Sequence, residues 1–151
     1  MDLPRNHKSF SLGGQLFKFF IRGEENSGTY TLIESSIPAR HIGSPPHIHS
    51  KEDLACYIIE GRFIFTLDNS EFTGEPGDFI FLPRGHKHWI KSESDSVAKM
   101  LVFASPPGFE RFCEAAGVPV DGNAGMPPPP TIDDLLKIVK EANNHGINVF
   151  F

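Results

Sequence analysis

Histidines are concentrated in the middle of the chain, and three of them have the spacing of metal ligands. His47 and His49 form a His-x-His pair, and His88 follows a strand-like segment that ends at Pro83. In an extended chain, side chains two positions apart point to the same face, about 6.6 Å from each other. Neutral imidazole is a good ligand for Zn, Fe, Ni and Cu, and three such groups leave positions open on the ion. The pair His47 and His49 can converge on one ion, and His88 at the start of a later strand is a candidate third ligand of a divalent-metal site.

Short strands must position these histidines. Residues 18–105 are a series of apolar segments of four to eight residues, separated by clusters of Gly, Pro, Asn, Asp and Ser. Strands at this spacing without intervening helical patterns indicate an antiparallel sandwich or barrel. We therefore expect an all-β fold in which more than half of residues 18–105 are strand.

The pattern changes to helical after Pro107. Phe109, Phe112 and Cys113 lie at i, i+3 and i+4, which predicts a short amphipathic helix. Residues 123–130 end in four prolines and predict an extended connector, and a second helix is expected to begin at Thr131. We therefore expect a β-barrel over residues 1–105 and a C-terminal helical extension over residues 106–151, packed on the same domain.

Composition excludes several classes of function. The 14 Lys and Arg are outnumbered by 19 Asp and Glu, a formal charge of −5, and the basic residues are scattered, so nucleic acid is not an expected partner. The longest apolar run, residues 54–59, is too short to cross a membrane as a helix, and the first 20 residues lack a signal-peptide pattern. Two cysteines predict free thiols rather than a disulfide framework, which indicates a cytoplasmic location.

Association with a second copy of the chain is also expected. Fourteen Phe residues and the apolar tail at 147–151 exceed what a small barrel can bury. Exposed apolar patches usually mark interfaces, so we predict a homodimer.

Two sequence motifs resemble the cupin superfamily, and within it the small single-domain cupins akin to quercetin dioxygenase. The first motif is matched by His47, His49 and Gly61, and the second by Gly77, Pro83, Gly85 and His88. The resemblance implies a double-stranded β-helix, a jelly-roll barrel whose interior holds the ligands, and it is consistent with a homodimer. It also implies a metal-binding glutamate separated from Gly61 by six residues, and this chain has Leu54 at that position.

The neighbours of Leu54 are poor substitutes for the missing carboxylate. Asp53 should point to the opposite face of the strand, and Glu52 should lie about 6.6 Å back along it. His86 shares the parity of His88 and either approaches the ion from the rim or points into water. Without a carboxylate the ion keeps its full charge, which favours an anionic chelating ligand such as an enolate or carboxylate.

Three functions remain open at this stage. A metal-dependent dioxygenase or related oxidoreductase would hold Fe, Mn, Ni or Zn on the three histidines and bind a small oxygenated or aromatic molecule. Its pocket would include Leu54, Cys56, Phe65 and His86. The alternative is a metal-free cupin that binds or senses a small molecule without turnover, a reading that Leu54 favours by making the pocket more apolar. Metal-free isomerase or epimerase chemistry, with a pocket histidine as base, is the third.

Overall fold

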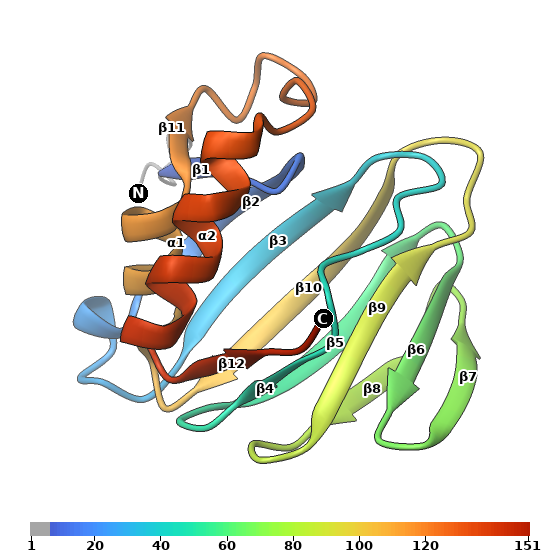
Figure 1. Cartoon of the computed structure of the whole chain (residues 1–151), viewed down its shortest axis with the longest axis horizontal. Helices are drawn as coiled ribbons and strands as arrows, with labels where there is room; N and C mark the ends of the chain where they lie inside the picture. Colours follow the sequence, from blue (N-terminus) through green and yellow to red (C-terminus); the bar gives the residue numbers. More distant parts are fainter. Residues whose placement is uncertain (1–6) are drawn as a thin grey trace, which may run out of the picture.

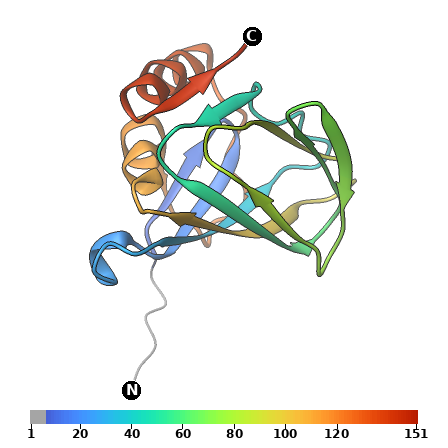
Figure 2. The same ribbon diagram turned by 90° about the horizontal axis from the view of Figure 1, so that it is seen from below.

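Two antiparallel β-sheets face each other in this computed structural model, which describes residues 7–151 (Figure 1). The large sheet contains, in spatial order, β11 (Val118–Val120), β1 (Ser9–Leu12), β2 (Gln15–Ile21), β3 (Thr31–Ile37), β10 (Ala98–Ser105), β5 (Asp53–Glu60) and β8 (Phe79–Leu82). The small sheet contains β12 (Ile147–Val149), β4 (His47–His49), β9 (Lys87–Ser92), β6 (Phe63–Leu67) and β7 (Ser70–Gly74). The view from below shows these strands around a common interior (Figure 2).

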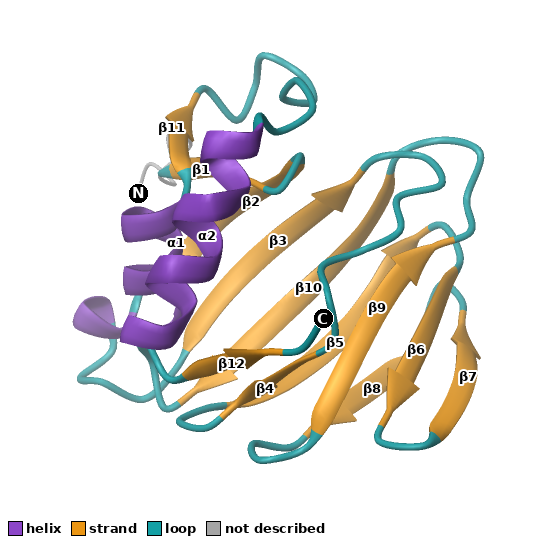
Figure 3. Ribbon diagram, in the orientation of Figure 1, coloured by secondary structure: helices purple, strands orange, loops and turns teal. Residues whose placement is uncertain are grey.

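The predicted all-β, jelly-roll architecture is confirmed. Strands occupy more than half of residues 18–105, and between residue 7 and Pro107 the helices amount to one short 3₁₀ turn, Gly23–Glu25. The two α-helices, α1 (Phe109–Ala116) and α2 (Ile132–Asn144), lie together on one side of the molecule (Figure 3). No helix in the described part of the chain is long and apolar enough to span a membrane.

Alternation of side chains explains how the strands build the interior. Along β5, Leu54, Cys56 and Ile58 are buried, whereas Tyr57 and Ile59 are exposed. A strand presents successive side chains to opposite faces, so the apolar even-numbered positions of β5 form the inner wall. On the small sheet, β4 and β9 carry His47, His49 and His88, which line the same interior space as Leu54 and Cys56.

The C-terminal segment is more than a helical extension. Helix α1 buries Phe109, Phe112 and Cys113, as its spacing predicts. After α2, however, the chain returns to the barrel as β12, which pairs antiparallel with β4 so that Ile147 lies opposite His49. β11 likewise extends the large sheet beside β1. The segment after Pro107 therefore forms part of both sheets.

Helix α2 begins at a well-defined point. Thr131 accepts a hydrogen bond from the Asp134 backbone N–H, and the Asp134 carboxylate accepts one from the Thr131 N–H. This capping box satisfies two backbone donors that the first turn leaves unpaired. It fixes the start of α2 directly after the proline connector, and the helix then lies over the open side of the barrel (Figures 1 and 2).

Candidate metal centre

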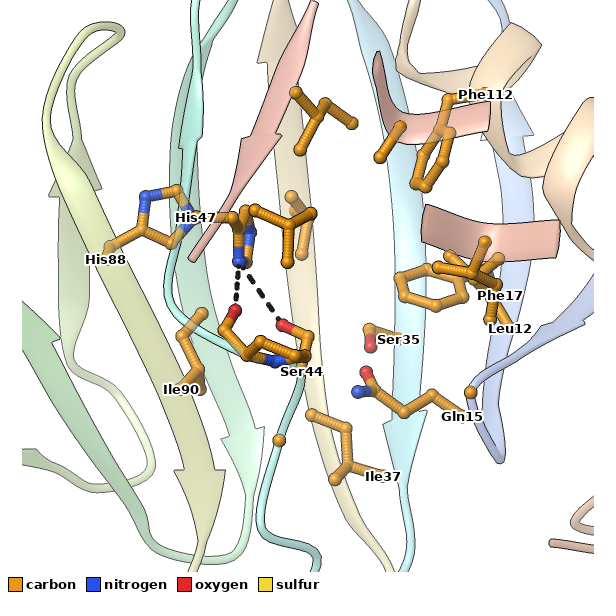
Figure 4. A pocket seen from close by; sticks show the side chains of 18 of the residues that line it. Leu12, Gln15, Phe17, Ser35, Ile37, Ser44, His47, His88, Ile90 and Phe112 are labelled. Atoms are coloured by element: carbon orange, nitrogen blue, oxygen red, sulfur yellow. Dashed lines mark hydrogen bonds between the residues drawn. The ribbon is translucent and has the colours of Figure 1, made fainter. Parts of the chain in front are cut away.

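The three predicted ligands lie on two adjacent strands of the small sheet. His47 on β4 lies directly opposite His88 on β9, and His49 follows two positions later on the same face of β4. One potential ligand nitrogen from each ring lies within 4.8 Å of the others. Figure 4 shows His47 and His88 turned toward the same space inside the barrel. The structure thus brings together the set that the sequence predicts.

Hydrogen bonds fix the tautomers of two of these rings. His47 Nδ1 lies 2.8 Å from the Pro45 carbonyl oxygen, and His49 Nδ1 lies 2.8 Å from Glu52 Oε1. Both partners are acceptors, so each Nδ1 must carry the proton and donate it. The Nε2 atoms of His47 and His49 are then left with free lone pairs, which is the form that binds a metal.

Burial favours the neutral forms of His47 and His88. Burial, together with the nearby His49, lowers the pKa of His47 to about 4. Burial also lowers the pKa of His88 to about 2, with additional contributions from His47 and His49. A metal needs unprotonated imidazole, so protons do not compete for His47 and His88 near neutral pH. Among the described residues, the buried His88 Nδ1 has no hydrogen-bond partner, and buried polar atoms of this kind normally have one.

Glu52 contributes in a way that the strand geometry does not indicate. It lies in the short loop between β4 and β5, and its side chain and that of His49 are each only 4% exposed. The carboxylate holds the outer nitrogen of His49, an arrangement that orients metal-binding histidines and raises their basicity. Its position three residues after His49 is the feature of the sequence that could have indicated this contact. Strand geometry considers Glu52 only as a direct metal ligand and places it too far from the ion.

Other polar groups near the site have partners elsewhere. Asp53 pairs with Arg84 at 3.1 Å, and hydrogen bonds from Arg84 lower the pKa of this carboxyl. His86 Nδ1 lies 2.7 Å from Asp68 Oδ2 at the surface. The expectation that His86 lines the pocket is therefore not met, because the turn before β9 carries its ring outward to Asp68. His41 does line the cavity, but backbone groups occupy both of its ring nitrogens.

The histidines open into a cavity of about 360 Å³ between the two sheets. Leu54 and Cys56 line it, as expected. Phe65 does not, because its ring is fully buried and packs against Phe63 and Phe72 instead. Burial raises the pKa of Cys56 to about 12, so this side chain is a neutral thiol and no nucleophile.

The lining of this cavity is mainly apolar. It contains no Asp, Glu, Lys or Arg among the described residues, and aliphatic and aromatic side chains dominate it. Part of this apolar wall comes from the C-terminal segment, a contribution that the sequence does not reveal. The residues supplied by α2 and β12 are Leu135, Ile138, Val139, Ala142, Ile147 and Val149.

Comparison with known proteins agrees with this architecture. The model of the cupin domain family matches residues 34–104, a span that runs from β3 to β10 and contains all three histidines. Residues 34–104 form a cupin domain. The chain is 34% identical over 79 residues to an uncharacterized protein of Methanocaldococcus jannaschii, covering 51% of this chain and 61% of that protein. It is 26% identical over 111 residues to the quercetin 2,3-dioxygenase of Bacillus subtilis, covering 74% of this chain and 32% of that enzyme.

The chain thus spans less than two thirds of the length of these relatives. Among solved structures, the polyketide cyclase RemF from Streptomyces resistomycificus superposes with a TM-score of 0.58 at 20% identity, covering 87% of this chain and 85% of that one. KdgF from Halomonas sp. superposes with a TM-score of 0.55 at 18% identity, covering 65% and 84%. At these identities the likeness establishes a shared fold.

Proposed function

We propose that this cupin holds a divalent transition metal on His47, His49 and His88 and acts on a small oxygenated or aromatic molecule as a dioxygenase-like oxidoreductase. The observation that carries the proposal is the group of three buried imidazoles whose potential ligand atoms lie within 4.8 Å of one another. The partial similarity to a quercetin 2,3-dioxygenase supports the reaction class.

The residues present fit such an ion. His47 Nδ1 donates a hydrogen bond to the Pro45 carbonyl, and His49 Nδ1 donates one to Glu52, so both Nε2 atoms are available to a metal. Fe, Mn, Ni or Zn suits imidazole ligands and, when bound, would polarise an oxygen group of the substrate. The chain itself supplies the ligand set, the hydrogen bond that orients His49, and a mainly apolar cavity wall.

The lining also restricts the ligand. Because no carboxylate lies in the described cavity wall, no side chain there offsets the charge of the ion or serves as an obvious proton acceptor. The proposal therefore favours molecules that carry an ionised oxygen group near neutral pH, such as an enolate, a phenolate or a carboxylate.

Oxygen uptake tests the proposal. Protein loaded with Fe(II), Mn(II) or Ni(II) is mixed with quercetin, whose neighbouring oxygen atoms chelate metals, and the rate is followed with an oxygen electrode. We expect uptake with at least one of these metals, none with Zn(II), and none for a His47→Ala/His49→Ala variant. Uptake that is equal in the variant and the parent would overturn the assignment of the site.

Leu54 favours a second function, a metal-free cupin that binds or senses a small molecule. This side chain stands where the cupin motif has its glutamate, and it makes the cavity more apolar. Under this alternative, quercetin binds equally well to the parent and to the histidine variant, in the presence or absence of EDTA, and no oxygen is consumed.

We further propose that the chain forms a homodimer through the outer face of the large sheet. Four exposed aromatic side chains lie on the adjacent strands β8, β5 and β10 of that face: Tyr57, Phe79, Phe81 and Phe103. Cross-strand pairing places Tyr57 opposite Phe79. A cluster of this kind is typical of an interface.

Two further proposals concern the chain as a whole. We propose that residues 1–105 and 106–151 fold as one unit, because β12 pairs with β4 and α2 completes the cavity wall. We also propose a cytoplasmic location, which is supported by the two buried free thiols of Cys56 and Cys113.

A further inference from the structure

Two polar side chains face the cavity from the large sheet, away from the histidines. Gln15 begins β2 and Ser35 lies in the middle of β3, and both line the cavity. Figure 4 shows them close together on the wall opposite His47 and His88. Among the residues drawn there, hydrogen bonds join only His47 to Ser44 and Pro45, so none links Gln15 to Ser35.

Strand pairing explains why these two side chains are neighbours. Phe17 on β2 lies opposite Ser35 on β3, and Gln15 precedes Phe17 by two positions, which puts it on the same face. On the other side of β3, Ser35 lies opposite Met100 of β10. The two polar groups are therefore diagonal neighbours on one sheet face, within reach of a common partner.

The surroundings of Ser35 are otherwise apolar. Its same-face neighbours along β3 are Ile33 and Ile37, both buried, and Ser35 itself is 3% exposed. A hydroxyl or amide placed in such an environment costs free energy unless it forms hydrogen bonds. Valine or leucine would pack at these positions without that cost, so Gln15 and Ser35 are suited to a hydrogen-bonding partner inside the cavity.

We propose that the cavity binds a ring-containing, mainly apolar molecule with polar groups at two ends. One end is an ionised oxygen group held at the histidine cluster, and the other is an uncharged hydroxyl or carbonyl that bonds with Gln15 and Ser35. The same cavity is lined by Phe17, Phe109 and Phe112, whose rings favour contact with another aromatic ring. Binding of the ionised end depends on the proposed function of the histidine cluster, whereas binding of the uncharged end depends only on the two polar side chains of the large sheet.

A matched series of naphthoates separates the two ends. The probe 3-hydroxy-2-naphthoate carries the ionised chelating end only, and its 3,5- and 3,7-dihydroxy analogues add one hydroxyl on the distant ring. Their intrinsic fluorescence gives Kd for the Zn(II)-loaded protein, in which the metal is redox-silent. A net hydrogen bond inside a protein changes affinity by about 3- to 10-fold. We expect at least one dihydroxy analogue to bind more tightly than the parent probe by that factor.

Three variants locate the origin of this advantage. Gln15→Leu and Ser35→Ala each remove one polar group from the cavity wall, and the double variant should abolish the advantage of the second hydroxyl. Ser36→Ala is the control, because Ser36 is an equally buried serine on the same strand that does not line the cavity. It should retain the full ratio between the two Kd values.

The outcomes distinguish the two proposals. Binding that is unchanged by EDTA overturns the metal site but leaves the ratio between analogues as a valid test of Gln15 and Ser35. Metal-dependent binding with no advantage for either dihydroxy analogue overturns the second end alone, as does an advantage that survives in the double variant. If no naphthoate binds, the proposed class of ligand is wrong.

Discussion

Glu52 should control metal affinity although its carboxylate contacts a histidine instead of the ion. Its Oε1 lies 2.8 Å from His49 Nδ1, and both side chains are almost fully buried. Replacing Glu52 by Ala removes the acceptor and leaves a buried N–H without a partner, which costs about 1–3 kcal/mol. The ring of His49 also loses the group that fixes its tautomer. Loss of such a partner lowers metal affinity by about 10- to 100-fold.

The conservative change predicts a smaller effect. Glu52→Gln keeps an oxygen that can accept the His49 proton, but the bond is no longer charge-assisted. Hydrogen bonds to charged groups are stronger than neutral ones by about 1 kcal/mol, so we expect a loss of about fivefold in metal affinity. The order parent, Gln variant, Ala variant is itself diagnostic, because a purely steric role for Glu52 would make the Gln variant equal to the parent.

Competition between the protein and a chromophoric chelator for Zn(II) at pH 7 measures these affinities. The control is Asp53→Asn, which removes a negative charge from the adjacent residue, whose partner is Arg84 at the surface. Circular dichroism checks that each variant is folded before titration. A Zn(II) affinity of Glu52→Ala within twofold of that of Asp53→Asn would refute the role assigned to Glu52.

Leu54→Glu should destabilise the metal-free protein, since loss of a buried leucine costs about 2–5 kcal/mol. The melting temperature of this variant should rise more with Mn(II) or Ni(II) than that of the parent, because binding at a hundredfold excess over Kd adds about 2.7 kcal/mol. An equal rise in both proteins would show that position 54 does not face a metal. The pKa values of His47, about 4, and His88, about 2, lie below the unfolded value of 6.5, so the unfolded chain binds protons first and the free energy of unfolding of the metal-free protein should fall as pH falls from about 6.5 toward 4. Urea unfolding checks this, and a His88→Gln variant with an equally steep pH dependence would contradict it. Light scattering should give twice the 16.8 kDa of one chain for the parent and a monomer for Phe79→Ser/Phe81→Ser, whereas a monomeric parent would exclude the dimer.

The sequence predicts the barrel and the three histidines well because both depend on local pattern. Alternation of apolar side chains identifies β5, and the spacing of His47 and His49 fixes their common face wherever the strand lies. His88 reaches the site because β9 pairs with β4. The spacing of His47 and His49 does not predict this pairing, but the second cupin motif identifies His88 as a ligand. These parts of the site required no knowledge of loop conformation.

The remaining parts depend on contacts between distant segments or on loop geometry. Glu52 reaches His49 because the loop after β4 turns back, which strand parity does not describe. His86 points outward because Asp68, 18 residues earlier, accepts its Nδ1 proton. The amphipathic pattern of α2 predicts a helix with one buried face, but only the return of the chain as β12 determines that this face covers the cavity.

Metal analysis tests most directly whether His47, His49 and His88 form a metal site. The protein is purified without chelators or a nickel column, dialysed against Zn(II) or Mn(II), and its metal content is measured by mass spectrometry. We expect one ion per chain, retained by the His145→Ala control and lost from His47→Ala/His49→Ala. Full retention of metal by that double variant, or no metal in the parent protein, would contradict the site.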